Sequence, residues 1–255
     1  MKKKVNEMSE KIEIRGTKLT EEEKTGVTEF VKSLSDILKS DLESIVLYGS
    51  GARQDYRPGK SDINLLVVVK RIDFHILKSV YEPVQKGRRF GIAPFILTQN
   101  DLQTSTDAFP VKFMSIKESS NVLWGSDALI DLKIDQEHIR LRCEQELKNL
   151  LLRMRRNYLI GGGRGLADFM VQSVGGFLEN LRFILYLSEG SMPPREKVVG
   201  QAVKKYGLDA DALKKVLSLR NREEPPPREE TEKLYGQFMS IVEKVSDVAD
   251  KLEGH

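Results

Sequence analysis

The chain has 255 residues, of which 40% are hydrophobic and 31% charged. This composition is typical of a soluble globular protein of one or two domains and excludes a disordered chain. The 41 basic and 38 acidic residues leave a formal net charge of only +3, so charge gives no argument for a nucleic-acid partner. The single cysteine, Cys143, excludes an internal disulfide and a multi-cysteine zinc site.

Targeting signals and membrane segments are not evident. The chain starts with Met-Lys-Lys-Lys, but no apolar segment follows this basic start, as a secretory signal would require. No stretch approaches the ~20 apolar residues of a membrane span. We therefore expect a cytoplasmic protein that does not enter a membrane.

The first half of the chain alternates between helical and extended patterns. Thr20 followed by three glutamates is a typical helix start, and apolar residues at helical spacing continue to Leu38. A run at residues 63–69, rich in Leu and Val, is typical of a strand buried on both faces. Helices are also predicted at residues 72–85 and near Asn100-Asp101, strands at 44–48, 90–98 and 111–116, and a turn at Trp124-Gly125.

The second half is predicted to be helical almost throughout. From about residue 135, apolar residues recur at three- and four-residue steps, and Cys143 lies on the first of these stripes as a buried structural thiol. Gly161-Gly162-Gly163 breaks the first helix, and no helix crosses Pro225-Pro226-Pro227. The predicted helices, joined by short loops, lie at residues 139–158, 166–185, 210–219 and 229–252, with a short one after Pro193-Pro194.

The most informative segment runs from residue 45 to residue 69. A β-rich run ends in Tyr48-Gly49-Ser50-Gly51-Ala52-Arg53, and a polar loop then leads to Lys60-Ser61-Asp62-Ile63-Asn64 at the head of the buried strand. The glycines permit a close backbone approach at a strand-to-helix turn. Free N–H groups at the start of the helix expected there, together with the Ser50 hydroxyl, can hold phosphate oxygens.

Charged residues of the same segment fit phosphate chemistry. Arg53, one turn into the expected helix, and Lys60, just before the aspartate, add positive charge. Asp62 directs a carboxylate at the place where a divalent cation bridging phosphates would lie. The segment therefore predicts a nucleotide-phosphate site formed by Gly49, Ser50, Gly51, Arg53 and Lys60, with Asp62 as the metal-binding carboxylate.

This pattern resembles that of the DNA polymerase β-like nucleotidyltransferase superfamily, and in particular its small bacterial members, the aminoglycoside and minimal nucleotidyltransferases. There a hydrophobic residue and Gly-Ser are followed by a short helix and by an Asp-hydrophobic-Asp pair that opens the next strand. The resemblance implies an α+β fold. It consists of a nucleotidyltransferase domain over residues 1–130, with a mixed sheet flanked by helices, and an antiparallel helical bundle over residues 131–255.

The sequence departs from the superfamily pattern at the metal ligands. The second carboxylate falls on Asn64, whose amide oxygen can coordinate a cation but brings no negative charge. The third is expected on the strand at residues 90–97, which contains no acid and has Ala93 or Pro94 at the matching position. Loss of a general base alone costs about 10²–10⁴-fold in rate, so we expect impaired transfer.

Other charged residues are further candidates for the site. Asp73 and Glu118 are acids that could swing in as replacement carboxylates, although both are more simply interpreted as surface residues. A basic run on or beside the first bundle helix could meet a triphosphate, but its interleaved glutamates favour a solvated face; it comprises Arg140, Arg142, Arg153, Arg155, Arg156 and Arg164.

The sequence is compatible with two classes of function. The first is a nucleotidyltransferase-fold protein that binds ATP and Mg²⁺, through Asp62 and weakly Asn64, with impaired or lost transferase activity. Its active form would transfer a nucleoside monophosphate from the triphosphate to a hydroxyl of a small molecule or protein. The second is a non-catalytic regulator that binds a partner protein. A homodimer is expected only by analogy with helical bundles that pair.

Overall fold

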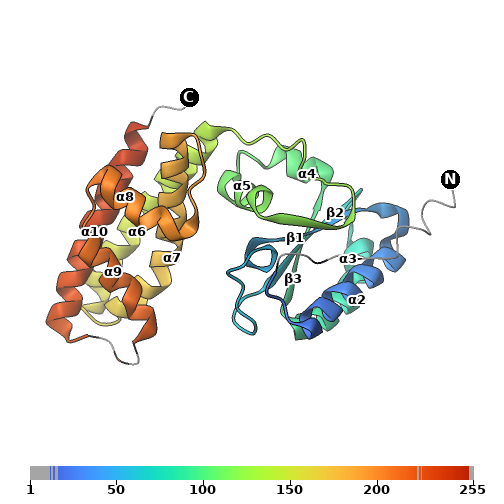
Figure 1. The fold of residues 1–255 in the computed structure, drawn as a ribbon, viewed down its shortest axis with the longest axis horizontal. Helices are drawn as coiled ribbons and strands as arrows, with labels where there is room; N and C mark the ends of the chain where they lie inside the picture. The colour runs from blue at the N-terminus through green and yellow to red at the C-terminus, as the bar shows by residue number, and fades with distance from the viewer. Residues whose placement is uncertain (1–11, 13, 15–16, 223, 225, 253–255) are drawn as a thin grey trace. The chain divides into compact units, whose positions relative to one another are not determined.

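The computed structural model describes residues 12, 14, 17–222, 224 and 226–252. The basic start of the chain and Pro225 of the proline connector lie outside these residues. The chain divides into two compact units, Met1–Ile134 and Asp135–His255, which are labelled by element in Figure 1.

The first unit is built on a mixed four-stranded sheet. Its strands are β1 (Leu42–Tyr48), β2 (Ile63–Val69), β3 (Ile92–Thr98) and β4 (Ser120–Gly125), in the order β3-β2-β1-β4. β1 is antiparallel to both β2 and β4, whereas β2 is parallel to β3. Six of the seven β2 residues are buried and Asn64 alone is partly exposed, which explains the nearly continuous Leu and Val run. The predicted mixed sheet is confirmed.

Helices cover both faces of this sheet (Figure 1). α2 (Glu21–Leu38) and α3 (Phe74–Gly87) lie on one face, where alternate β2 residues such as Ile63 and Leu65 join a shared apolar core. α4 (Gln99–Thr104) and α5 (Pro110–Glu118) lie on the other, where Leu66 packs with Phe113 and Ile116. We call this second side the α5 face. The period-two alternation of β2 therefore assigns each side chain to one face.

Two predicted elements of this unit are wrong. Residues 111–116 form the middle of α5 and not a strand, because Pro110 occupies the first helical turn and Phe113 and Ile116 bury one side at helical spacing. Trp124-Gly125 belongs to β4 and not to a turn. β4 pairs with β1 through Ser44↔Gly125 and Ile45↔Trp124, a contact between distant segments that local sequence does not reveal.

The second unit is helical, as predicted. Its helices are α6 (Gln136–Gly161), α7 (Leu166–Glu189), α8 (Val198–Tyr206), α9 (Ala210–Ser218) and α10 (Arg228–Lys251), of which α6, α7 and α10 pack against one another. Gly162, in the left-handed conformation at φ 55°, ends α6. Cys143 is fully buried on α6, and burial raises the pKa of its thiol to about 12, so its interpretation as a structural residue agrees with its environment.

Short 3-10 turns complete the described secondary structure. They are η1 (Lys39–Asp41), η2 (Gly49–Ala52), η3 (Arg88–Phe90), η4 (Arg195–Lys197) and η5 (Leu219–Asn221). None of the described helices is both long enough and apolar enough to cross a membrane.

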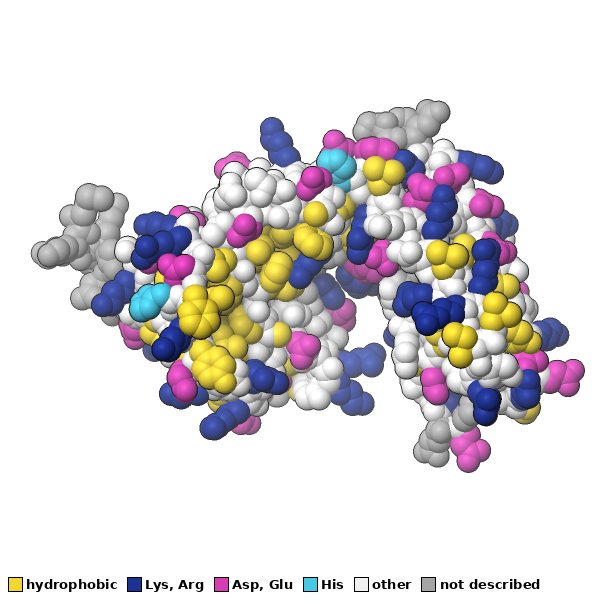
Figure 2. Space-filling view, turned by 180° about the vertical axis from the view of Figure 1, so that it is seen from behind, with side chains coloured by type: hydrophobic (Ala, Val, Ile, Leu, Met, Phe, Trp, Pro, Cys, Tyr) yellow, Lys and Arg dark blue, Asp and Glu magenta, His cyan; other side chains and the backbone are white. Residues whose placement is uncertain are grey.

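Charges of both signs are interspersed over the face shown in Figure 2. Many of the bundle cations are neutralised by neighbours. Arg140 bonds Glu137 at 2.7 Å and Glu144 at 3.0 Å, and Arg155 bonds Glu243 on α10 at 3.2 Å. These pairs support the interpretation of the basic run as a solvated helix face.

Candidate functional site

The candidate site is built around a row of three residues across the sheet. Asn64 on β2 pairs with Tyr48 on β1 and with Ala93 on β3. Because side chains alternate along a strand, Asn64 lies on the α5 face with Leu66, and Ala93 lies beside it. The register thus assigns Ala93, and not Pro94, to the position next to Asn64 on that face.

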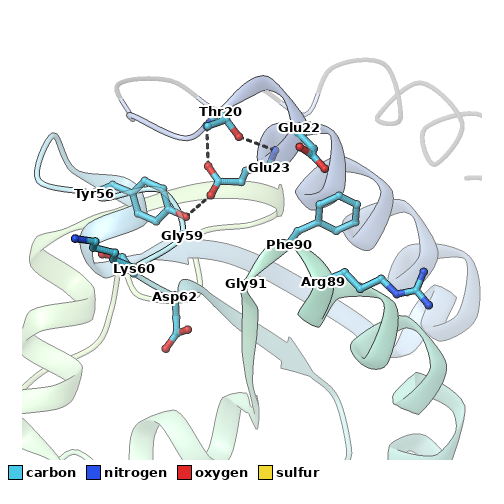
Figure 3. A pocket seen from close by; sticks show the side chains of 11 residues that line it. Thr20, Glu22, Glu23, Tyr56, Gly59, Lys60, Asp62, Arg89, Phe90 and Gly91 are labelled. Carbon is cyan, nitrogen blue, oxygen red and sulfur yellow. Dashed lines mark hydrogen bonds between the residues drawn. The ribbon is translucent and has the colours of Figure 1, made fainter.

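Asp62 lies beside this row, two residues before Asn64 and immediately before β2. It precedes Ile63, which packs on the α2/α3 side, so alternation gives Asp62 the same face as Asn64. In Figure 3 the Asp62 carboxylate points away from Tyr56 and Glu23. The side chain is exposed to solvent. Asp62 and Asn64 are thus brought together, as the sequence predicts.

The glycine-serine turn closes against Asn64. Gly49 has a φ of 71°, a left-handed conformation that favours glycine, and a Cβ added there would lie 3.5 Å from Asn64 Nδ2, at ordinary contact distance. The Gly49 N–H donates to the Ser119 carbonyl at 3.1 Å. Gly51 is buried against Leu47, whose Cδ1 would lie 3.1 Å from an added Cβ. Gly51 therefore packs the turn onto the strand.

The helix expected after Ser50 is absent. Gly49–Ala52 form a four-residue 3-10 turn, after which Arg53 is extended at φ −126° and ψ 173°. The segment that follows contains Pro58 and Gly59 and continues as a loop to Ser61, since proline and glycine oppose helix propagation. The expectation of a helix N-terminus for phosphates is therefore wrong, and the Ser50 hydroxyl and the turn's backbone remain as the groups that could hold them.

Arg53 and Lys60, the two cations predicted for this loop, differ in their contacts. Arg53 forms a two-pronged ion pair with Asp55, with Nε–Oδ1 at 3.0 Å and Nη2–Oδ2 at 3.1 Å. Its charge is largely neutralised within the loop, so Arg53 would have to leave Asp55 to reach a phosphate. Lys60 is exposed and, in Figure 3, extends away from the Tyr56 ring.

The loop is anchored to the start of α2 by a buried tyrosine. The Tyr56 hydroxyl donates to Glu23 Oε1 at 2.7 Å, while Glu23 Oε2 accepts the Thr20 N–H at 2.8 Å in the capping box of α2 (Figure 3). Burial first, and then the bond to Glu23, raise the pKa of the Tyr56 hydroxyl. A cavity of about 520 Å³ lies between this anchor, Asp62 and Gly91. The anchor fixes the loop that carries Lys60 and Asp62.

Replacing Tyr56 by phenylalanine should lower the free energy of unfolding by about 1 kcal/mol, because one hydrogen bond is lost while the ring still fills its site. Urea denaturation measures this difference. Tyr81→Phe is the matched control, since Tyr81 lies exposed on α3 and its substitution should change stability by less than about 0.5 kcal/mol. Equal effects of the two substitutions would show that the Tyr56–Glu23 bond does not hold the loop.

The two replacement acids lie in different places. Asp73 caps α3, where its carboxylate accepts the Ile76 N–H at 2.8 Å, and this hydrogen bond lowers its pKa. It follows the far end of β2 and does not join the site. Glu118 ends α5 next to Ser119, whose carbonyl bonds Gly49. Of the two, only Glu118 is attached to a segment that touches the turn.

The donor set does not fit a two-metal nucleotidyl-transfer site. Such a site needs several carboxylates to hold two cations, which in turn stabilise the charge on the attacking and leaving oxygens. Asp62 and the row beside it offer one carboxylate, the Asn64 amide and the Ala93 methyl group. Across the described ranges, no group of three or more Asp, Glu, His or Cys residues is arranged to hold a metal ion.

One residue of the α5 face was not predicted. The Lys112 ammonium on α5 lies 3.5 Å from the centroid of the Phe95 ring, and Phe95 is two residues beyond Ala93 on β3. Burial lowers the pKa of Lys112. The sequence carries no signal for this contact, because it depends on residues 111–116 forming a helix that packs over β3.

Known proteins resemble the chain in sequence and in structure. It matches no protein-family model. A putative protein adenylyltransferase of Methanocaldococcus jannaschii is 44% identical over 71 residues, which are 28% of this chain and 69% of that protein. Among solved structures, a spectinomycin adenyltransferase from Enterococcus faecialis, crystallised with ATP and spectinomycin, matches 91% of this chain and 100% of its own. Its TM-score is 0.57 at 15% sequence identity, so this second likeness is one of fold.

Proposed function

The chain belongs to the nucleotidyltransferase superfamily, and from this we propose that its first unit binds ATP or a similar nucleoside triphosphate but transfers the nucleotide slowly or not at all. Both similar proteins carry adenylyl transfer in their names, which favours ATP. The Ser50 hydroxyl and the backbone of the Gly49–Ala52 turn are the groups proposed to hold the phosphates.

The proposal that nucleotide transfer is slow or absent rests on the row formed by Tyr48, Asn64 and Ala93. In a transfer reaction the acceptor hydroxyl oxygen forms a new bond to the α-phosphorus. The bond to the bridging oxygen of the β-phosphate breaks, pyrophosphate leaves, and a base takes the hydroxyl proton. Asp62 supplies a carboxylate beside this row, whereas the Ala93 side chain, at the position expected for a third carboxylate, cannot accept a proton. The site can hold the reactants better than it can stabilise their transition state.

An active transferase is the alternative, with a hydroxyl of a small molecule or protein as acceptor. The names of the similar proteins favour it, and so does the bond between Gly49 and Ser119, which brings the backbone beside Glu118 to the turn. A rotation of the Glu118 side chain would then supply the missing base.

Calorimetry with ATP tests the binding proposal. The wild type should bind ATP, and Ser50→Ala should weaken binding by about 3- to 10-fold, the range expected for one hydrogen bond. Ser79→Ala is the matched control, because Ser79 bonds the Ile76 carbonyl within α3, away from the row. Absence of ATP binding would leave a partner-binding scaffold as the function.

A transfer assay separates the two forms of the proposal. ATP labelled at the α-phosphate is incubated with the protein, Mg²⁺ and a mixture of small-molecule and protein acceptors. We expect no label transfer above the background of an Asp62→Ala variant. Rapid transfer that disappears in Asp62→Ala would establish an active enzyme, and its loss in Glu118→Gln as well would identify the base.

A further inference from the structure

We infer that Lys112 supplies the positive charge for the nucleotide phosphates, so that ATP binds to this site without depending on a metal ion. The inference rests on the proposed function, since it needs a triphosphate over the row. It follows from the disagreement between the donor set of the row and the carboxylates that a two-metal site requires.

The sheet register relates Lys112 to the row. Phe95 pairs with Leu66. This pair lies two residues further along β2 and β3 than the Asn64–Ala93 pair, and on the same face. Two residues of a strand span about 6.6 Å. Phe95, whose ring the ammonium contacts, is therefore one such step from Ala93 along β3, and the flexible four-carbon stem of lysine lets the ammonium turn toward the row.

The charge of Lys112 is not committed to a carboxylate. Within the part of the chain that the structure describes, Lys112 forms no salt bridge; its recorded contact is the face of the Phe95 ring. Arg53, in contrast, is already paired with Asp55. A cation held by a ring is stabilised only by about 0.5–1 kcal/mol at an exposed site, so a phosphate oxygen can displace the ring as its partner.

The surroundings also favour an anionic ligand. β3 carries no acidic residue between Ile92 and Thr98, and the row presents a methyl group where a carboxylate would repel phosphates. Burial lowers the pKa of Lys112 because part of its hydration has been removed. A phosphate would return the lost charge stabilisation. In this arrangement Lys112 and Asp62 take the place of the several carboxylates and metal ions of a two-metal site.

Calorimetry with ATP, once in Mg²⁺ and once in EDTA, tests the lysine site. The wild type should bind with dissociation constants that differ by less than about threefold between the two conditions. Lys112→Ala should weaken binding in EDTA by about tenfold, the loss expected for one charge-assisted contact to phosphate. Lys112→Arg should retain most of the affinity, which shows that charge and not the lysine stem matters.

The control removes the same charge from the opposite side of the sheet. Lys86 lies exposed near the end of α3, and Lys86→Ala should leave ATP binding unchanged. Asp62→Ala adds a second discriminating variant: in EDTA it should bind ATP as well as the wild type or more tightly, because an anion near the phosphates is removed. Weaker binding in EDTA would contradict the inference.

The outcomes separate the two proposals. A wild type that binds ATP only with Mg²⁺, or a Lys112→Ala variant that binds like the wild type, would overturn the lysine site and leave the proposed function standing. A wild type that binds no ATP in either condition would overturn the proposed function, and the lysine site with it.

Discussion

Replacing Asn64 and Ala93 together by aspartate should create a magnesium site in the first unit and raise the rate of nucleotide transfer by about 10²-fold or more. The two positions are paired in the β2–β3 register and lie on the same face of the sheet. Asp62 lies two residues before Asn64 on that face. The double variant therefore groups three carboxylates at one end of the sheet. Three acids supply the charge that holds cations and a base for the acceptor proton.

The comparison of single and double variants shows which group is missing. Asn64→Asp alone should raise Mg²⁺ affinity by about tenfold, measured by calorimetry, because a charged ligand replaces a neutral one at the same place. Ala93→Asn, combined with Asn64→Asp, is the matched control, since it adds an amide of similar size without charge. If the double aspartate variant gained neither metal affinity nor transfer, the row would not be the centre of the site.

Gly125→Ala should lower the free energy of unfolding of the first unit by about 3 kcal/mol or more, through backbone strain and a direct clash. Gly125 ends β4 with a φ of 78°, and a Cβ added there would lie 2.1 Å from the Glu43 carbonyl oxygen. The clash is with backbone, so no side-chain rotation relieves it. β4 would have to separate from β1 at the Ser44↔Gly125 pair.

Urea denaturation followed by tryptophan fluorescence measures this effect, because the single tryptophan, Trp124, is the neighbour of Gly125. Gly59→Ala provides the control: Gly59 has a similar φ of 69°, but no atom lies within 4 Å of an added Cβ. Its cost should be about 1–2 kcal/mol, the strain of the left-handed conformation alone. Equal losses in the two variants would show that the contact with Glu43 does not constrain β4.

Local patterns in the sequence predict much of the first unit. The capping box at Thr20, the buried strand at residues 63–69 and the helical spacing of the second half depend on neighbours in the chain, and all three are confirmed. The pairing of Gly49-Ser50 with Asp62 and Asn64 is also predictable, because two adjacent strands must begin or end at the same edge of the sheet.

Other elements depend on contacts that the chain makes only after it folds. Residues 111–116 carry apolar residues at both strand and helix spacing, and their burial under Leu66 and Val68 decides for a helix. β4 needs β1 as its partner. The position of Lys112 over Phe95 follows from α5, so a wrong secondary structure for this segment also hides the contact between Lys112 and the Phe95 ring.

The hydrogen bond from Gly49 to the Ser119 carbonyl joins the Gly49–Ala52 turn to the junction between α5 and β4. Lys112 lies on α5, and Ser120 at the start of β4 pairs with Tyr48 at the end of β1. A fluctuation that peels the first residues of β4 away from β1 would therefore disturb the serine turn and the lysine helix together. The two groups proposed to hold the phosphates therefore depend on the same pairing of β4 with β1.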